Sequence, residues 1–212
     1  MLRFLVAFIF FPIAFFSQDD FGIWSKASFQ YKLNKKISFT SKSEIRTKEN
    51  ALRRNQLYTQ FSGKYKINKS FSVVMAYRVK SLQREYGDEI QNRFHVDVTK
   101  RKKFNELSFY LRSRTQYNMA RLDLNEWCER FRLKAKYDYS KKLNYFIYHE
   151  IYLLLNNREQ NPYNKNRFGT GLEYNLNKSL SVELKYLRIS DVNTSNPETL
   201  NIIGVTVNHQ LN

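Results

Sequence analysis

The stretch YKLNKKIS, residues 31–38, recurs as YKINKSFS at residues 65–72 and as YNLNKSLS at residues 174–181. In each copy, Asn-Lys stands between the end of one alternating run of apolar and polar residues and the start of the next. Asn tolerates the positive φ angle that tight hairpin turns require, so each copy predicts a two-residue turn between antiparallel strands. Degenerate copies near Lys102 and Lys141 continue the repeat. The repeating unit is therefore a β-hairpin.

The segments between these turns alternate with a period of two. In residues 21–33 the odd positions are mostly apolar, whereas the even positions include Lys26. Residues 130–139 repeat the pattern, with Leu133 on the apolar face and Lys134 on the polar face. We expect eleven such strands, most of them about 12 to 14 residues long.

Composition supports a single all-β domain. Aromatic residues make up 16% of the chain, whereas Gly (6) and Pro (3) are sparse, so strand formers are many and breakers are few. The single cysteine, Cys128, has no partner for an intramolecular disulfide. The net charge of +17 raises nucleic-acid binding as a possibility. We expect no such binding, because the basic residues follow the strand alternation and the chain begins with an export signal.

That signal is the N-terminal stretch MLRFLVAFIFFPIAFFS, in which one positive charge, Arg3, precedes an apolar run that ends in a small residue, Ser17. The run is short for a membrane-spanning helix, and acidic residues follow it. These features predict a signal peptide over residues 1–17, cleavage after Ser17, and a mature barrel over residues 18–212.

Strand length and connection length favour a membrane barrel over a soluble one. Soluble strands average about 5 to 6 residues, whereas these are about twice as long and are joined by alternately tight and long connections. The tyrosines beside the tight turns, Tyr31, Tyr65, Tyr139 and Tyr174, would form an aromatic girdle at one membrane interface. The sequence predicts an antiparallel up-and-down transmembrane β-barrel of about 10 to 12 strands in the outer membrane of a Gram-negative bacterium. A secreted soluble β-barrel that binds an apolar ligand is the alternative.

The number of strands conflicts with one rule. Bacterial single-chain barrels have even numbers of strands, whereas eleven are counted here. We expect either that the first segment lies partly outside the ladder and ten strands close the barrel, or that one strand is missing from the count and twelve close it.

Charged residues occupy the face predicted to line the lumen, and basic ones predominate. They favour an anion-attracting pore or pocket, and the alternative is a closed interior of ion pairs. The predicted lumen-facing charges are Arg78, Lys80, Arg93, Asp97, Arg112, Arg114, Arg130, Arg132, Lys134, Lys136, Glu150, Glu173, Glu183 and Lys185.

Catalytic signals are weak. His95 and Asp97 share the predicted inner face, and His149 lies on the outer face. A membrane-embedded hydrolase would need a serine such as Ser113 or Ser43 beside His149, and the sequence does not place one there. We predict no catalytic, cofactor or metal site and no enzyme activity, with a barrel-embedded enzyme as the alternative.

The early stretch DFGIWSKASFQYKLNKKISF, residues 20–39, the LNKS turn and the closing GVTVNHQL, residues 204–211, resemble the family of small Gram-negative outer-membrane proteins catalogued as domain of unknown function 2490. The resemblance implies an outer-membrane location and no established activity. We therefore expect a structural barrel or a small passive channel that prefers anions. Its partners would be outer-membrane lipid and small anionic solutes, and its oligomeric state stays open.

Overall fold

A computed structural model describes residues 19–120, 125–156 and 161–211 of the chain. The predicted signal peptide, residues 1–17, lies outside the described residues. The strands are β1 (Asp20–Lys32), β2 (Ile37–Lys48), β3 (Arg53–Lys66), β4 (Phe71–Arg84), β5 (Gly87–Phe104), β6 (Leu107–Met119), β7 (Glu126–Asp138), β8 (Leu143–Leu154), β9 (Tyr163–Asn175), β10 (Leu180–Asp191) and β11 (Thr199–Gln210).

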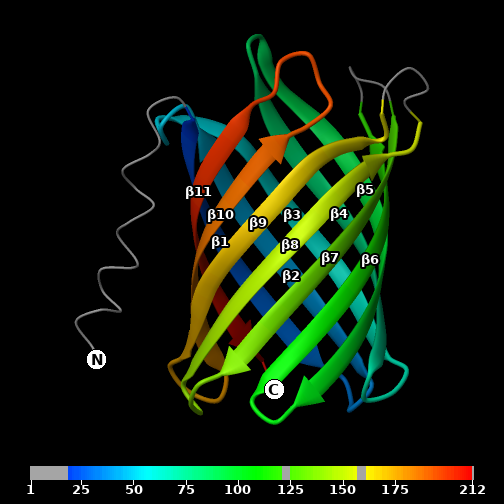
Figure 1. The fold of residues 1–212 in the computed structure, drawn as a ribbon, viewed down its shortest axis with the longest axis vertical. Coiled ribbons are helices and arrows are strands. Elements are labelled where there is room, and N and C mark those ends of the chain that lie inside the picture. The colour runs from blue at the N-terminus through cyan, green and yellow to red at the C-terminus, as the bar shows by residue number, and fades with distance from the viewer. Residues whose placement is uncertain (1–18, 121–124, 157–160, 212) are drawn as a thin grey trace.

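These strands close into one barrel, in which each strand pairs with its neighbours in the chain and β1 pairs with β11. Figure 1 shows tight turns at one end of the barrel, called here the turn end, and the other end is called the loop end. At the loop end the connections after β6, β8 and β10 are longer, whereas those after β2 and β4 are as short as the tight turns. The all-β barrel fold and the count of eleven strands, made over the described residues, are confirmed.

The closure of the barrel differs from the prediction. Neither ten nor twelve strands close it, and the pattern is not wholly antiparallel, because β1 and β11 pair in parallel. An odd number of alternating strands makes the first and last point the same way, so only a parallel pair can join them. Trp24 pairs with Arg46 on β2 and with Gly204 on β11, which places the first segment fully in the ladder. Consequently β1 starts at the loop end, whereas β11 finishes at the turn end (Figure 1).

The repeated turns work by a different mechanism from the one predicted. Asn34 is not among the residues with positive φ; instead its Oδ1 accepts hydrogen bonds of 2.8 Å from the backbone N–H groups of Lys36 and Ile37. Asn68 and Asn177 make equivalent bonds, and Ser140 replaces Asn in the fourth turn. The recurring Asn therefore caps a four-residue turn through its side chain.

One predicted turn is misplaced. Lys102 lies inside β5, and the chain reverses at Asn105–Glu106. Asn105 has a positive φ of 47°, which Asn tolerates better than most residues. Exposed lysines near the end of β5 imitate a polar turn in the sequence although they still belong to the strand.

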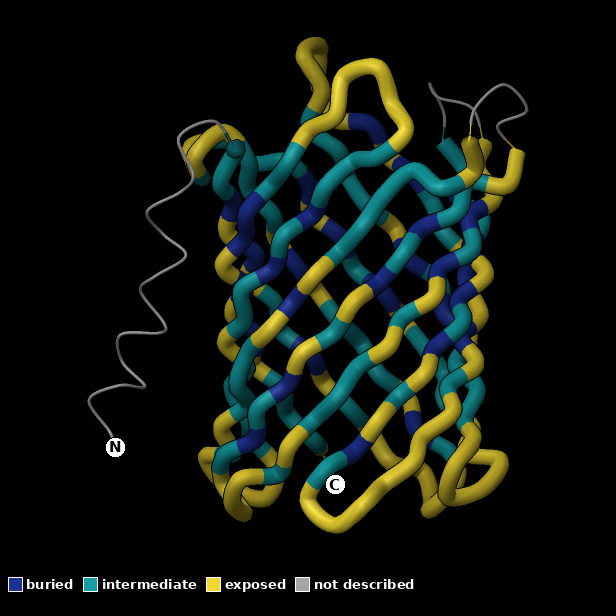
Figure 2. Tube along the Cα trace, viewed as in Figure 1, coloured by how far each residue is buried: buried dark blue, intermediate teal, exposed yellow. Residues whose placement is uncertain are grey.

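The two faces of each strand differ in character. Exposed and buried residues alternate along the strands in Figure 2, and the exposed ones include most of the large apolar side chains. Met75 is 66% exposed and Leu133 is 57% exposed on the outer face. The tyrosines predicted to form a girdle are exposed and lie at the turn end. The outside of the barrel is therefore an apolar wall.

A small apolar cluster lies inside the barrel. Trp24, Leu187, Ile189 and Ile202 are buried against one another. The part-buried Tyr148 packs against them, and it approaches β9 so closely that a Cβ at Gly169 would lie 2.3 Å from its ring. The remaining interior is mostly polar, as the buried glutamines, asparagines and arginines indicate.

Candidate functional site

The predicted lumen-facing charges lie on the inner positions of their strands, but they do not form one uniform lining. Six of them are buried, namely Arg78, Asp97, Arg112, Arg114, Arg130 and Glu150. The other eight are partly exposed, namely Lys80, Arg93, Arg132, Lys134, Lys136, Glu173, Glu183 and Lys185. Of the others, Lys136, Glu173 and Glu183 lie near the turn-end limits of their strands.

Two carboxylates organise the buried charges. Asp97 on β5 accepts two hydrogen bonds from Arg114 on β6, with N–O distances of 2.6 and 2.7 Å. Glu150 on β8 accepts one of 2.6 Å from Arg130 on β7 and another from Arg112 on β6. Arg112 also lies 3.7 Å from Asp97, so it joins the two pairs. The network thus connects four consecutive strands through charge-assisted hydrogen bonds.

A second set of contacts extends this network around the lumen through aromatic rings. The guanidinium of Arg130 lies 4.1 Å from the ring of Tyr152, and that of Arg167 on β9 lies 4.6 Å from the same ring. Arg167 also lies 5.8 Å from Trp24 on β1, over which Arg46 of β2 stacks at 3.6 Å. Arginines from β2 and β9 therefore meet at one indole ring.

The chain of contacts continues onto β3 and β4. Glu44 forms an ion pair with Arg46 and accepts a hydrogen bond of 2.9 Å from Tyr58. Arg78 stacks on the Tyr58 ring at 3.7 Å and donates to Gln60 at 2.7 Å. These side chains from β1 to β9 are called here the mid-lumen layer, which consists of Trp24, Glu44, Arg46, Tyr58, Gln60, Arg78, Asp97, Arg112, Arg114, Arg130, Glu150, Tyr152 and Arg167.

Several members of this layer were not predicted from the sequence. Glu44, Arg46 and Arg167 lie on the inner positions of β2 and β9, so the same alternation could have found them. No sequence pattern predicts the contact between Arg167 and Trp24, because this contact joins strands that are distant along the chain and do not pair with each other.

Below the mid-lumen layer, toward the turn end, lies a polar cavity of about 410 Å³. Its lining includes Lys42, Glu173, Thr40, Ser28 and Asn208, together with residues of the turn between β9 and β10. Most of the lining groups are hydroxyls, amides or charges, which can hydrogen-bond to a polar solute.

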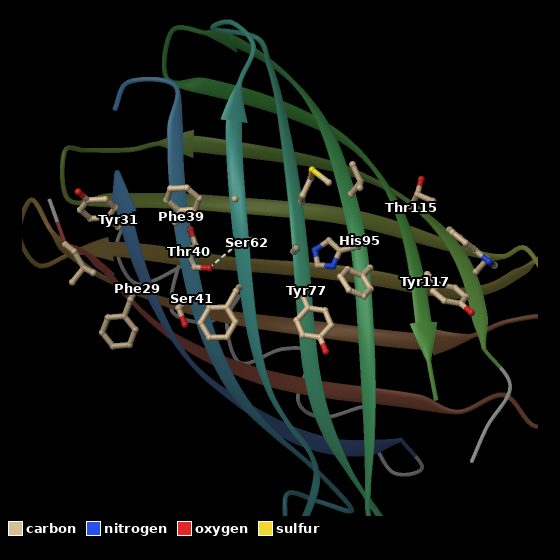
Figure 3. Close-up of a pocket in the computed structure, with 18 residues that line it drawn as sticks. Phe29, Tyr31, Phe39, Thr40, Ser41, Ser62, Tyr77, His95, Thr115 and Tyr117 are labelled. Carbon is tan, nitrogen blue, oxygen red and sulfur yellow. Dashed lines mark hydrogen bonds between the residues drawn. The ribbon is translucent and has the colours of Figure 1, made fainter. Parts of the chain in front are cut away.

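The outer wall carries a second, apolar cavity of about 710 Å³. Figure 3 shows Phe29, Phe39, Tyr77 and Tyr117 along it, and they come from β1, β2, β4 and β6. Neighbouring rings touch in this wall, since the Tyr77 and Phe94 centroids lie 4.7 Å apart. The apolar character of the groove matches the rest of the outer face.

The histidines and serines considered as catalytic residues lie apart. His95 is buried on the inner face, and His149 is exposed on the outer face, where it pairs with Leu133 and Phe168. Ser113 donates a 2.6 Å hydrogen bond to Glu129 rather than to a histidine. Ser43 shares a 3.1 Å hydrogen bond with Thr59.

No group of three or more His, Cys, Asp or Glu side chains in the described parts of the chain has the arrangement of a metal site. Within the same residues, no helix has the length and apolar character needed to cross a bilayer.

A comparison with known protein families shows which family the chain belongs to. A family described as protein of unknown function (DUF2490) matches residues 21–201, which include all of β2 to β10 and most of β1. The chain belongs to this family. The family resemblance inferred from the sequence is therefore confirmed. No curated protein compared with the chain matches it.

Proposed function

We propose that this DUF2490 protein is an outer-membrane barrel whose lumen is closed at mid-height, so that it serves as a structural barrel rather than an open channel. The support for a membrane location is the apolar outer wall. Monomeric soluble proteins rarely expose contiguous apolar patches larger than a few hundred Å², whereas here large apolar residues are exposed on strands all around the barrel. Lipid is the solvent that such a wall fits.

The orientation follows from the connections. In bacterial outer-membrane barrels, short turns face the periplasm and longer loops face outward. The turn end would then be periplasmic, with Tyr31, Tyr65 and Tyr174 at the inner interface. On this assignment β1 begins at the outer surface and β11 ends in the periplasm.

The observation that carries the closed lumen is the mid-lumen layer. Its side chains extend inward from nine consecutive strands, and Arg167 reaches from β9 toward Trp24 on β1, a strand with which β9 does not pair. Bidentate pairs such as Arg114–Asp97 hold guanidinium groups in fixed positions. A solute would have to displace several charged groups to pass.

Two measurements test this proposal. The protein should fractionate with outer membranes and need detergent for solubility; a monodisperse protein without detergent would contradict the membrane location. Reconstituted liposomes should not swell in small sugars at a rate above that of empty liposomes. Rapid swelling by correctly folded protein would contradict the closed lumen.

A further inference from the structure

We propose that the cavity at the turn end of the lumen binds a small phosphate-bearing solute, with Lys42 as its anion contact. The cavity holds about 410 Å³, within the size range of pockets for small ligands. The proposal rests on the closed lumen proposed above, since the mid-lumen layer lies farther along the same interior.

The charge balance of the cavity favours an anion. Its carboxylate, Glu173, is compensated because it accepts hydrogen bonds from Lys136 at 2.8 Å and from Ser181 at 3.3 Å. Lys42 also lines the cavity, yet its side chain makes no hydrogen bond or ion pair with any residue that the structure describes. An ammonium group in a partly enclosed space without an ion-pair partner of its own attracts an anion.

Two more cations without an ion-pair partner among the described residues lie on the inner face of β7. Arg132 and Lys134 form no ion pair within the described ranges, and Lys134 lies instead 4.0 Å from the ring of Phe146. The Nε atom of Arg132 is buried and has no hydrogen-bond partner within the described residues. Arg132 and Lys134 therefore add positive charge to the interior of the barrel, within a wall of low dielectric constant.

The rim around the cavity would draw anions toward it. The tight turns carry six lysines, namely Lys35, Lys36, Lys69, Lys141, Lys142 and Lys178, against one carboxylate, Glu106. Charges of one sign around an opening raise the local concentration of oppositely charged solutes and speed their association.

The uncharged groups of the cavity lining favour a ligand that carries hydroxyl groups as well as a negative charge. Ser28, Thr40, Ser181 and Asn208 supply hydroxyl and amide groups around Lys42. Thr206, one inner position above Asn208 on β11, is buried with no partner for its Oγ1 atom. Such groups suit the hydroxyls of a small polyol, so a phosphate monoester of a polyol fits the site better than a bare anion.

Calorimetric titration of the full barrel, folded in a neutral detergent, tests the proposal with three probes: inorganic phosphate, glycerol phosphate and glycerol. We expect saturable binding of both phosphates, tighter for glycerol phosphate, and no binding of glycerol. Lys42→Gln should weaken the binding of glycerol phosphate by about tenfold or more, because the substitution removes charge-assisted hydrogen bonds. Lys42→Arg, which keeps the charge, should retain most of the affinity.

A matched control is Lys165→Gln, which removes a lysine at the loop end that pairs with Asp191 at 2.9 Å. This variant should bind both phosphates as the wild type does. Absence of phosphate binding, or equal affinity of the wild type and Lys42→Gln, would overturn the proposal. Binding that only Lys165→Gln weakens would place the anion at the other end and overturn it as well. Short-chain phosphatidic acid should not compete; competition would assign the phosphate to lipid.

The titration needs neither membrane insertion nor measurement of conductance. If the titration detects no phosphate binding and the barrel does not conduct ions, only the proposed anion site is overturned. A conducting barrel that still binds phosphate through Lys42 would overturn the closed lumen instead.

Discussion

Replacement of Leu133 by Arg tests which face of the barrel meets lipid. Leu133 lies in the middle of β7, where it pairs with Leu111 and His149, and it is 57% exposed on the outer wall. A lipid-facing arginine near the bilayer midplane costs about 2–4 kcal/mol. The neighbouring Lys134 faces the lumen without a carboxylate partner, and Lys134→Gln removes a contact with Phe146 worth about 0.5–1 kcal/mol. Leu133→Arg should therefore be the more damaging change by about 2 kcal/mol.

The stability of both variants is measured by urea unfolding from phospholipid vesicles. The folded fraction is followed by the mobility of the unheated protein in gel electrophoresis. Both proteins should share the wild-type slope, so that the midpoints report stability. Equal destabilisation by the two substitutions, or greater damage from Lys134→Gln, would refute the assignment of the faces. It would also favour a soluble barrel with an apolar interior ligand.

Three further changes probe the interior, the turns and the loop end. Glu150→Gln removes the carboxylate that the buried Arg112 and Arg130 share and should cost about 3 kcal/mol or more in urea unfolding, whereas a cost below about 1 kcal/mol would mean that the layer is hydrated. Asn68→Ala removes two side-chain bonds to the turn backbone and should cost about 1 kcal/mol; no change in the urea midpoint would contradict the capping role. Hydrogen bonds from Ser81 and Arg54 lower the pKa of the exposed Asp88 carboxyl at the loop end. Its contribution to stability is therefore present above its unfolded pKa and is lost as pH falls through the lower folded value. Carboxyl NMR titration should give a midpoint that rises in Arg54→Ala, and an unchanged midpoint would contradict the pairing.

The strands and their faces could be predicted because both are local properties of the sequence. Alternation over residues such as Phe131 to Ala135 requires only that one face be apolar, and the Asn residues of the turns recur with each hairpin. The turn beside Lys102 was misplaced, because exposed charges can extend a strand beyond the apolar wall.

Closure and the mid-lumen layer could not be predicted in the same way. Closure depends on the pairing of the first strand with the last, such as Trp24 with Gly204, which no short-range pattern encodes. The contact between Arg167 and Trp24 depends in addition on the stagger of the strands around the barrel. A list of inner charges therefore predicted a basic lumen but not which arginines stack on which rings.

Single-channel recording in planar bilayers tests the closed lumen most directly. The wild-type protein should give no steady conductance steps. A variant that removes three residues of the mid-lumen layer, Trp24→Ala with Arg46→Ser and Arg167→Ser, should insert and conduct, with a preference for anions set by the remaining basic residues. Retained heat-modifiable mobility of the variant would show that it still folds. Steady steps from the wild type, with the same size and selectivity as those of the variant, would contradict the account.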